Sequence, residues 1–200
     1  MAASLPDGEV SWRIAIAGQN PLVAYAGTGR FFQPGQIWRT VNGGGAWEHA
    51  GDCGPALPRL NTCQPVMDPN DPDTVYAVVE GVGIGGGGDI IRRTIDGGLT
   101  WTTLGLPALS VSLTVLPTIP STLLAQVYDP TDAGRYVLVM STDRGEHWTP
   151  SNAGLPHNAE ISGIVFDPRD PTHLFAGTQG RGVFRSVDGG VTWEPTGLTR

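Results

Sequence analysis

The sequence contains no lysine, and its twelve basic residues are all arginine, against nineteen acidic residues. The formal net charge is therefore −7 at pH 7. Binding to nucleic acid or to an anionic membrane surface requires clustered basic residues that replace counterions, and the sequence has no basic stripe of this kind. We therefore expect neither nucleic acid nor an anionic membrane as a general partner.

Long apolar runs are also missing. No segment approaches the roughly 18 apolar residues of a membrane-spanning helix, so we expect no membrane insertion. Nor does any long window repeat its apolar residues at the 3.6-residue period of an amphipathic helix, which predicts essentially no helix. The first nine residues lack the charged and apolar segments of a secretory signal.

Cysteine occurs only twice, at Cys53 and Cys63, in one proline-containing stretch. An even number of cysteines without other thiols favours a disulfide in an extracytoplasmic or secreted protein, and two buried free thiols in a cytosolic protein are the alternative. A metal site is disfavoured because the spacing is wide and no second Cys or His pair accompanies the two. We expect neither a metal nor a cofactor.

The sequence does contain a nine-residue pattern written four times, at residues 39–47, 93–101, 140–148 and 185–193. Its tryptophans recur after 54, 47 and 45 residues, and such self-similarity indicates a repeat architecture. In each copy a Ser or Thr ends one strand, Asp or Asn folds back onto turn N–H groups, glycine permits a positive φ, and Trp opens the next strand. Each copy therefore predicts a capped hairpin.

The pattern Ser/Thr-x-Asp-x-Gly-x-x-Trp resembles the Asp-box, or BNR repeat, of β-propellers such as sialidases, xyloglucan-active hydrolases, sortilin-type receptors and the photosystem II assembly propeller. The resemblance covers nearly the whole chain, with Asn42 in place of Asp in the first copy, and Ala46 and His147 in place of the usual Thr. It implies structural roles for the turn caps and the interblade tryptophans, which are Asn42, Asp96, Asp143, Asp188, Trp47, Trp101, Trp148 and Trp193.

Between these turns, short apolar runs predict four antiparallel strands per repeat. In the first and last repeats we expect strands at 12–17 and 161–166, at 24–28 and 173–178, and at 36–41 and 182–187. The predicted fold is an all-β propeller domain with blades at about 5–54, 55–106, 107–155 and 156–200. Since a propeller closes to protect its edges, the chain is a complete four-bladed ring, half of a ring completed by a second copy, or a fragment of a longer array.

Two further motifs resemble ligand sites, but we interpret both as structural. Residues 81–88 contain G-x-G-x-x-G, but the next segment reads as a strand instead of a phosphate-binding helix, which favours a loop between the second and third strands. Asp68, Asp71 and Asp73 offer oxygen ligands for calcium, yet their Asp-Pro setting repeats at residues 167–171 and is typical of a turn between the first two strands.

For function, a glycosidase needs two carboxyl groups facing one sugar. The loose candidates, which stand in no recognisable motif, are Asp7, Glu9, Glu160, Arg13, Arg59, Arg135 and Arg181. The widest loop expected between second and third strands, at 29–35, combines aromatic rings with a cation, which suits binding of a glycan or a protein. We therefore favour a non-catalytic binding module over a divergent or partial glycoside hydrolase. The candidate ligand contacts are Arg30, Phe31, Phe32, Gln33, His157, Glu160 and Arg181.

Overall fold

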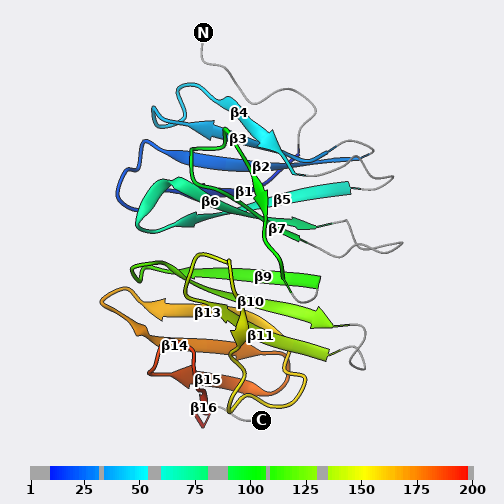
Figure 1. The fold of residues 1–200 in the computed structure, drawn as a ribbon, viewed down its shortest axis with the longest axis vertical. Helices are drawn as coiled ribbons and strands as arrows, with labels where there is room; N and C mark the ends of the chain where they lie inside the picture. Colours follow the sequence, from blue (N-terminus) through cyan, green and yellow to red (C-terminus); the bar gives the residue numbers. More distant parts are fainter. Residues whose placement is uncertain are drawn as a thin grey trace. The chain divides into compact units, whose positions relative to one another are not determined.

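The structure, a computed structural model, describes residues 10–31, 34–53, 60–80, 90–106, 109–129 and 135–197 (Figure 1). Within these ranges every regular element is a strand, which confirms the predicted all-β fold. Among the same residues no helix is long and apolar enough to span a membrane.

The strands group into four blades, one for each sequence repeat. Blade 1 contains β1 (Val10–Ile16), β2 (Ala24–Phe31), β3 (Gln36–Thr40) and β4 (Glu48–Asp52), and blade 2 contains β5 (Leu60–Asp68), β6 (Asp71–Glu80), β7 (Ile90–Thr94) and β8 (Thr102–Thr103). Blade 3 contains β9 (Leu109–Leu116), β10 (Thr122–Asp129), β11 (Arg135–Ser141) and β12 (Thr149–Pro150), and blade 4 contains β13 (Ile161–Asp167), β14 (Asp170–Thr178), β15 (Gly182–Ser186) and β16 (Glu194–Pro195). Neighbouring strands within each blade pair antiparallel.

Blades 1 and 2 form one compact unit that ends at Leu104, and blades 3 and 4 form a second that begins at Gly105. We call them unit 1 and unit 2. Alternate residues of a strand point to opposite faces of its sheet, so each blade has two faces. In blades 1 and 3 we call the face that packs on the following blade the forward face, and in blades 2 and 4 we call the face that packs on the preceding blade the backward face. The opposite face of each blade takes the other name.

Each unit buries a hydrophobic core between its two blades. In unit 1 the forward face of blade 1, with Tyr25 and Ile37, belongs to one cluster with Val75, Ala77 and Val79 on the backward face of blade 2. The unit 2 core follows the same rule, with Leu116, Leu124 and Leu138 of blade 3 clustered with Leu174, Ala176, Phe184 and Trp193 of blade 4. The alternation of residues along the strands therefore determines which residues of each blade enter this core.

Two loop predictions are wrong. The turn expected from Asp68 to Asp73 is shorter, because β5 runs to Asp68 and β6 starts at Asp71. The loop expected at 29–35 is partly strand: β2 continues to Phe31, and its last three residues pair with the start of β5, from Leu60 to Thr62. The reason is that this second pairing satisfies backbone N–H and C=O groups that a free loop would leave to water.

A disulfide joins Cys53, just after β4, to Cys63 in β5, with 6.0 Å between their Cα atoms. Both cysteines are buried in the core of unit 1. The predicted bond is therefore confirmed, and it connects the last strand of blade 1 to the first strand of blade 2.

Candidate functional site

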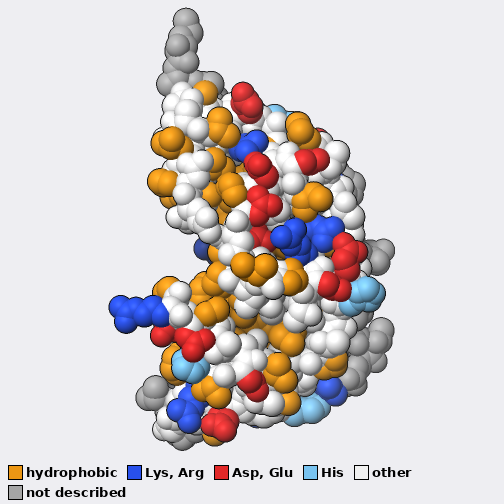
Figure 2. Space-filling view, turned by 60° about the vertical axis from the view of Figure 1, so that its left-hand side comes forward, with side chains coloured by type: hydrophobic (Ala, Val, Ile, Leu, Met, Phe, Trp, Pro, Cys, Tyr) orange, Lys and Arg blue, Asp and Glu red, His pale blue; other side chains and the backbone are white. Residues whose placement is uncertain are grey.

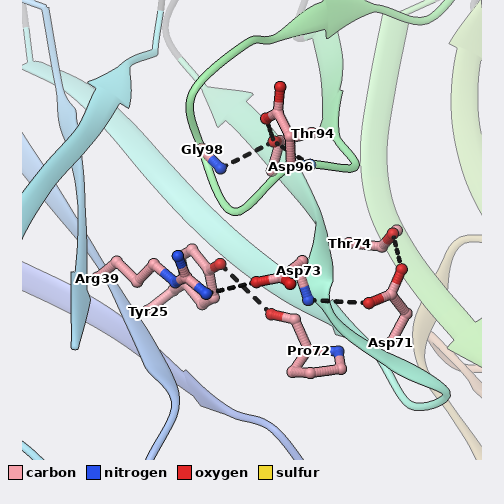
Figure 3. A network of polar contacts seen from close by, with 9 residues as sticks. All are labelled: Tyr25, Arg39, Asp71, Pro72, Asp73, Thr74, Thr94, Asp96 and Gly98. Carbon is pink, nitrogen blue, oxygen red and sulfur yellow. Dashed lines mark hydrogen bonds and ion pairs between the residues drawn. The ribbon is translucent and has the colours of Figure 1, made fainter. Parts of the chain in front are cut away.

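The Asp-box turns share one hydrogen-bond pattern, seen in blade 2 (Figure 3). The buried Thr94 hydroxyl donates to Asp96 Oδ1 at 2.7 Å and accepts from the Gly98 N–H at 2.9 Å. Asp96 Oδ1 also accepts from the Thr100 N–H at 2.9 Å. The same three bonds form around Thr40 and Asn42, Ser141 and Asp143, and Ser186 and Asp188.

The buried hydroxyl is the part of this turn that sequence reasoning undervalued. The pattern predicts only that it ends a strand, yet it both donates to the cap and accepts from the turn. Its constant place two residues before Asp or Asn in all four copies was the available signal. The turns are thus self-contained, and their polar atoms are largely used by their own backbone.

These bonds also stabilise the charged form of the caps. Hydrogen bonds from the Thr100 hydroxyl, the Thr100 N–H and the Thr94 hydroxyl lower the pKa of Asp96 to about 2. Hydrogen bonds from the backbone and side chain of His147 hold the pKa of Asp143 well below its usual range. A carboxylate that accepts several hydrogen bonds is easier to ionise.

We expect the Asp96→Asn variant to resist acid better than the wild type. A lowered carboxyl pKa contributes stability that is complete above the unfolded value of about 4 and is lost as pH falls toward about 2. Asn42 shows that an amide oxygen can accept the same bonds. The measurement is the urea-unfolding free energy of both proteins between about pH 6 and pH 2. Parallel losses in the two proteins would contradict a role for the Asp96 carboxylate.

Two of the four tryptophans hold consecutive blades together. Trp101 of blade 2 donates its Nε1–H to the Ala50 carbonyl of blade 1 at 2.7 Å, and Trp193 of blade 4 donates to the Ser151 carbonyl of blade 3 at 2.9 Å. Trp148 instead donates to the Gly145 carbonyl of its own turn, at 3.1 Å. Ala50 and Ser151 each lie three residues after the tryptophan of their own blade.

The three aspartates that could have bound calcium form hydrogen bonds at the turn between β5 and β6 or an ion pair with blade 1. Asp68 Oδ1 accepts from the Asn70 N–H at 2.9 Å, and Asp71 Oδ1 accepts from the Asp73 N–H at 3.0 Å. Asp73 forms an ion pair with Arg39 of blade 1, and Figure 3 shows the two side chains pointing toward each other. Among the described residues no group of three or more His, Cys, Asp or Glu side chains is arranged to hold a metal ion.

The ends of each blade differ. At one end the Asp-box turn bonds the beginning of the second strand: the Gly97 N–H donates to the Asp73 carbonyl in β6, and the Gly189 N–H donates to the Thr172 carbonyl in β14. The opposite end, which we call the loop end, carries the connections between second and third strands and those between blades. There the Gln179 N–H donates to the Glu160 carbonyl at 2.9 Å.

The loop end of unit 2 gathers aromatic and polar side chains. Tyr128 of β10 and Tyr136 of β11 form a cross-strand ring pair with centroids 5.2 Å apart. Gln179 Nε2 donates to Glu160 Oε1 at 2.6 Å. Burial raises the pKa of Tyr136, and the charge of Glu160 and the neighbouring Tyr128 raise it further. We call these four residues the tyrosine–glutamate cluster.

This cluster includes one of the ligand contacts proposed from the sequence. Glu160 belongs to it, whereas His157 and Arg181 are exposed at the same end of unit 2. Sequence reasoning missed Tyr128, Tyr136 and Gln179, although the two tyrosines stand at matching places before and after one loop. The side chains of Arg30 and Phe31, and residues Phe32 and Gln33, lie outside the described residues.

No protein-family model and no curated protein sequence matches the chain. Solved structures do match it. A GH74 enzyme from Niastella koreensis aligns with 91% of this chain at a TM-score of 0.67 and 22% identity, and YCF48 from Cyanidioschyzon merolae aligns with 96% at a TM-score of 0.55 and 16% identity. A GH93 α-L-arabinofuranosidase of Fusarium graminearum, in complex with arabinobiose, aligns with 94% at a TM-score of 0.58 and 13% identity.

The chain has the fold of the Asp-box β-propellers. The alignment covers 28% of the Niastella GH74 enzyme, 57% of YCF48 and 66% of the arabinofuranosidase. This Asp-box propeller chain therefore spans only part of the length of the solved structures that it matches.

Proposed function

We propose that this Asp-box propeller binds carbohydrate through the tyrosine–glutamate cluster at the loop end of unit 2. The observation that carries the proposal is the Tyr128–Tyr136 ring pair, which is held to the segment of Glu160 by a 2.8 Å hydrogen bond from the Tyr136 N–H to Asn158 Oδ1. Gln179 orients the Glu160 carboxylate. Sugar rings pack their C–H faces on aromatic rings, while carboxylate and amide groups accept and donate hydrogen bonds to hydroxyls. The cluster offers both kinds of contact in one place.

The overall charge narrows the ligand class. A net charge of −7 disfavours an acidic polysaccharide, because like charges repel across the surface. A neutral glycan fits better, and the comparisons point in the same direction, since one matched structure is in complex with arabinobiose and another is a xyloglucanase from Xanthomonas campestris. Neutral plant cell-wall oligosaccharides are therefore the first ligands to test.

We expect Tyr136→Ala to weaken binding of such an oligosaccharide about tenfold, or about 1.4 kcal/mol, because it removes half of the ring pair. Tyr136→Phe is the matched control, since it keeps the ring and removes only the hydroxyl. Binding is measured by a glycan array followed by titration calorimetry, with melting curves to show that both variants fold. Unchanged affinity in Tyr136→Ala would contradict the proposed site, and the absence of any glycan ligand would favour a protein partner.

A glycoside hydrolase is the second candidate, favoured by the number of hydrolases among the matched structures. Hydrolysis needs a second carboxyl group about 5–10 Å from the first. Among the described side chains of unit 2, Glu160 is the one carboxylate at the loop end, while the side chains of Asp129 and Asp132 lie outside the described residues. Release of aryl alcohol from aryl glycosides by the wild type, and its loss in Glu160→Gln, would establish the hydrolase.

A further inference from the structure

The forward face of blade 4 is apolar and uncovered. Val165 and Phe175 are 64% and 49% exposed there. A Cβ atom added to Gly163 or Gly177 on this face would meet no atom within 4 Å. The surface of unit 2 thus carries hydrophobic side chains, as Figure 2 shows for both units.

The same positions in blade 1 show what such a face normally contacts. Gly27 pairs with Ile37 as Gly177 pairs with Val183, but a Cβ on Gly27 would lie 1.9 Å from the Cys63 carbonyl of blade 2. Tyr25, which corresponds to Phe175, is fully buried and donates its hydroxyl to the Pro72 carbonyl of blade 2. A covered forward face is therefore in close backbone contact with its neighbour.

The backward face of blade 1 is uncovered in the same way. Ile14 and Ile16 are both 60% exposed. Their counterparts in blade 4, Ile164 and Phe166, pack against the core of unit 2. Unit 1 thus presents an uncovered backward face, and unit 2 an uncovered forward face.

The two free faces carry the elements that join blades elsewhere in the chain. Phe175 pairs with Arg185 across β14 and β15, as Tyr25 pairs with Arg39 across β2 and β3, where the arginine reaches Asp73 of the next blade. Trp47 stands in blade 1 where Trp101 and Trp193 stand in blades 2 and 4. The residue three positions after Trp193, which corresponds to Ala50 and Ser151, is Thr196.

We propose that the forward face of blade 4 binds the backward face of blade 1 of a second copy of this chain. Each copy carries both of these faces, so a second copy can supply the partner that each face lacks. Two such contacts related by a two-fold axis make a closed dimer, the commonest form of a homo-oligomer. In this junction Trp47 of one copy donates to the Thr196 carbonyl of the other.

Sedimentation velocity at physiological ionic strength, where the like net charges are screened, tests this directly. The wild-type chain of 21.0 kDa should sediment as a dimer of twice that mass. Phe175→Arg and Ile16→Glu should each give a monomer. Gly177→Leu should also give a monomer. Its melting curve should match that of the wild type diluted until it is monomeric, because the folded unit has open space at that position.

Leu99→Glu is the matched control. Leu99 is 86% exposed in the Asp-box turn of blade 2, and Glu146 naturally occupies the same place in blade 3. This variant should remain a dimer. A dimer that survived Phe175→Arg or Gly177→Leu would overturn the proposal.

Mixing the two face variants separates this head-to-tail contact from a symmetric one. Ile16→Glu retains a functional blade 4 face and Phe175→Arg retains a functional blade 1 face, so an equimolar mixture should form a heterodimer although neither variant dimerises alone. A monomeric wild-type protein would overturn the proposal, as would a mixture that stays monomeric. Wild-type filaments would overturn the closed dimer, since they require a head-to-tail contact that does not close.

Discussion

Replacing Trp193 with alanine should lower the free energy of unfolding of unit 2 by about 3–5 kcal/mol. Its side chain is only 3% exposed and lies in the core shared by blades 3 and 4. The change removes the packing of the indole ring and also leaves the Ser151 carbonyl without the Trp193 Nε1–H donor. Chemical denaturation followed by circular dichroism measures the loss.

Trp148→Ala is the control for this prediction. Trp148 is half-buried, and its Nε1–H bonds only the Gly145 carbonyl of its own turn. Its replacement should therefore cost less than that of Trp193. Equal losses would mean that the turn motif itself, and not the contact between blades, determines the contribution of these tryptophans.

Replacing Gly27 with alanine should destabilise unit 1 by about 3 kcal/mol, at the upper end of the usual overpacking penalty. The new methyl group would lie 1.9 Å from the Cys63 carbonyl oxygen and 2.7 Å from Pro65 Cδ. Both atoms belong to β5, so relief requires the two blades to move apart. The loss is measured by urea denaturation in the presence of the intact disulfide.

Gly177→Ala supplies the matched comparison, because Gly177 holds the same position in blade 4 with no atom within 4 Å of the added Cβ. Measured at concentrations where the protein is monomeric, it should change stability by less than about 0.5 kcal/mol. If both substitutions were equally harmful, the intrinsic preference of the strand position would explain the Gly27 effect and the close approach of β5 would not.

The features that could be predicted from the sequence are local ones. The strand expected at 36–41 differs from β3 by one residue, and that expected at 182–187 differs from β15 by one residue. These boundaries follow from the alternation of apolar residues and from the Asp-box turn that ends each third strand, and both signals lie within a few consecutive residues. The four-fold repetition then made the blade architecture evident.

The features that were missed depend on contacts between distant residues. The pairing of Arg30 with Asn61 joins segments that read separately as a loop and a strand start. Tyr128 and Tyr136 meet only because the register of β10 and β11 places them opposite each other. A sequence shows the presence of these side chains, but their juxtaposition follows from strand register and from the turn between the strands.

The Cys53–Cys63 bond also determines how the chain would carry mechanical load. Tension applied along the polypeptide passes from the end of β4 through the two sulfur atoms into β5, so the segment between the cysteines bears none of it. With a sequence separation of 10, roughly 35 Å of chain cannot extend. Pulling blade 1 from its N-terminal side therefore transmits force directly to the first strand of blade 2, which binds both β2 and β6.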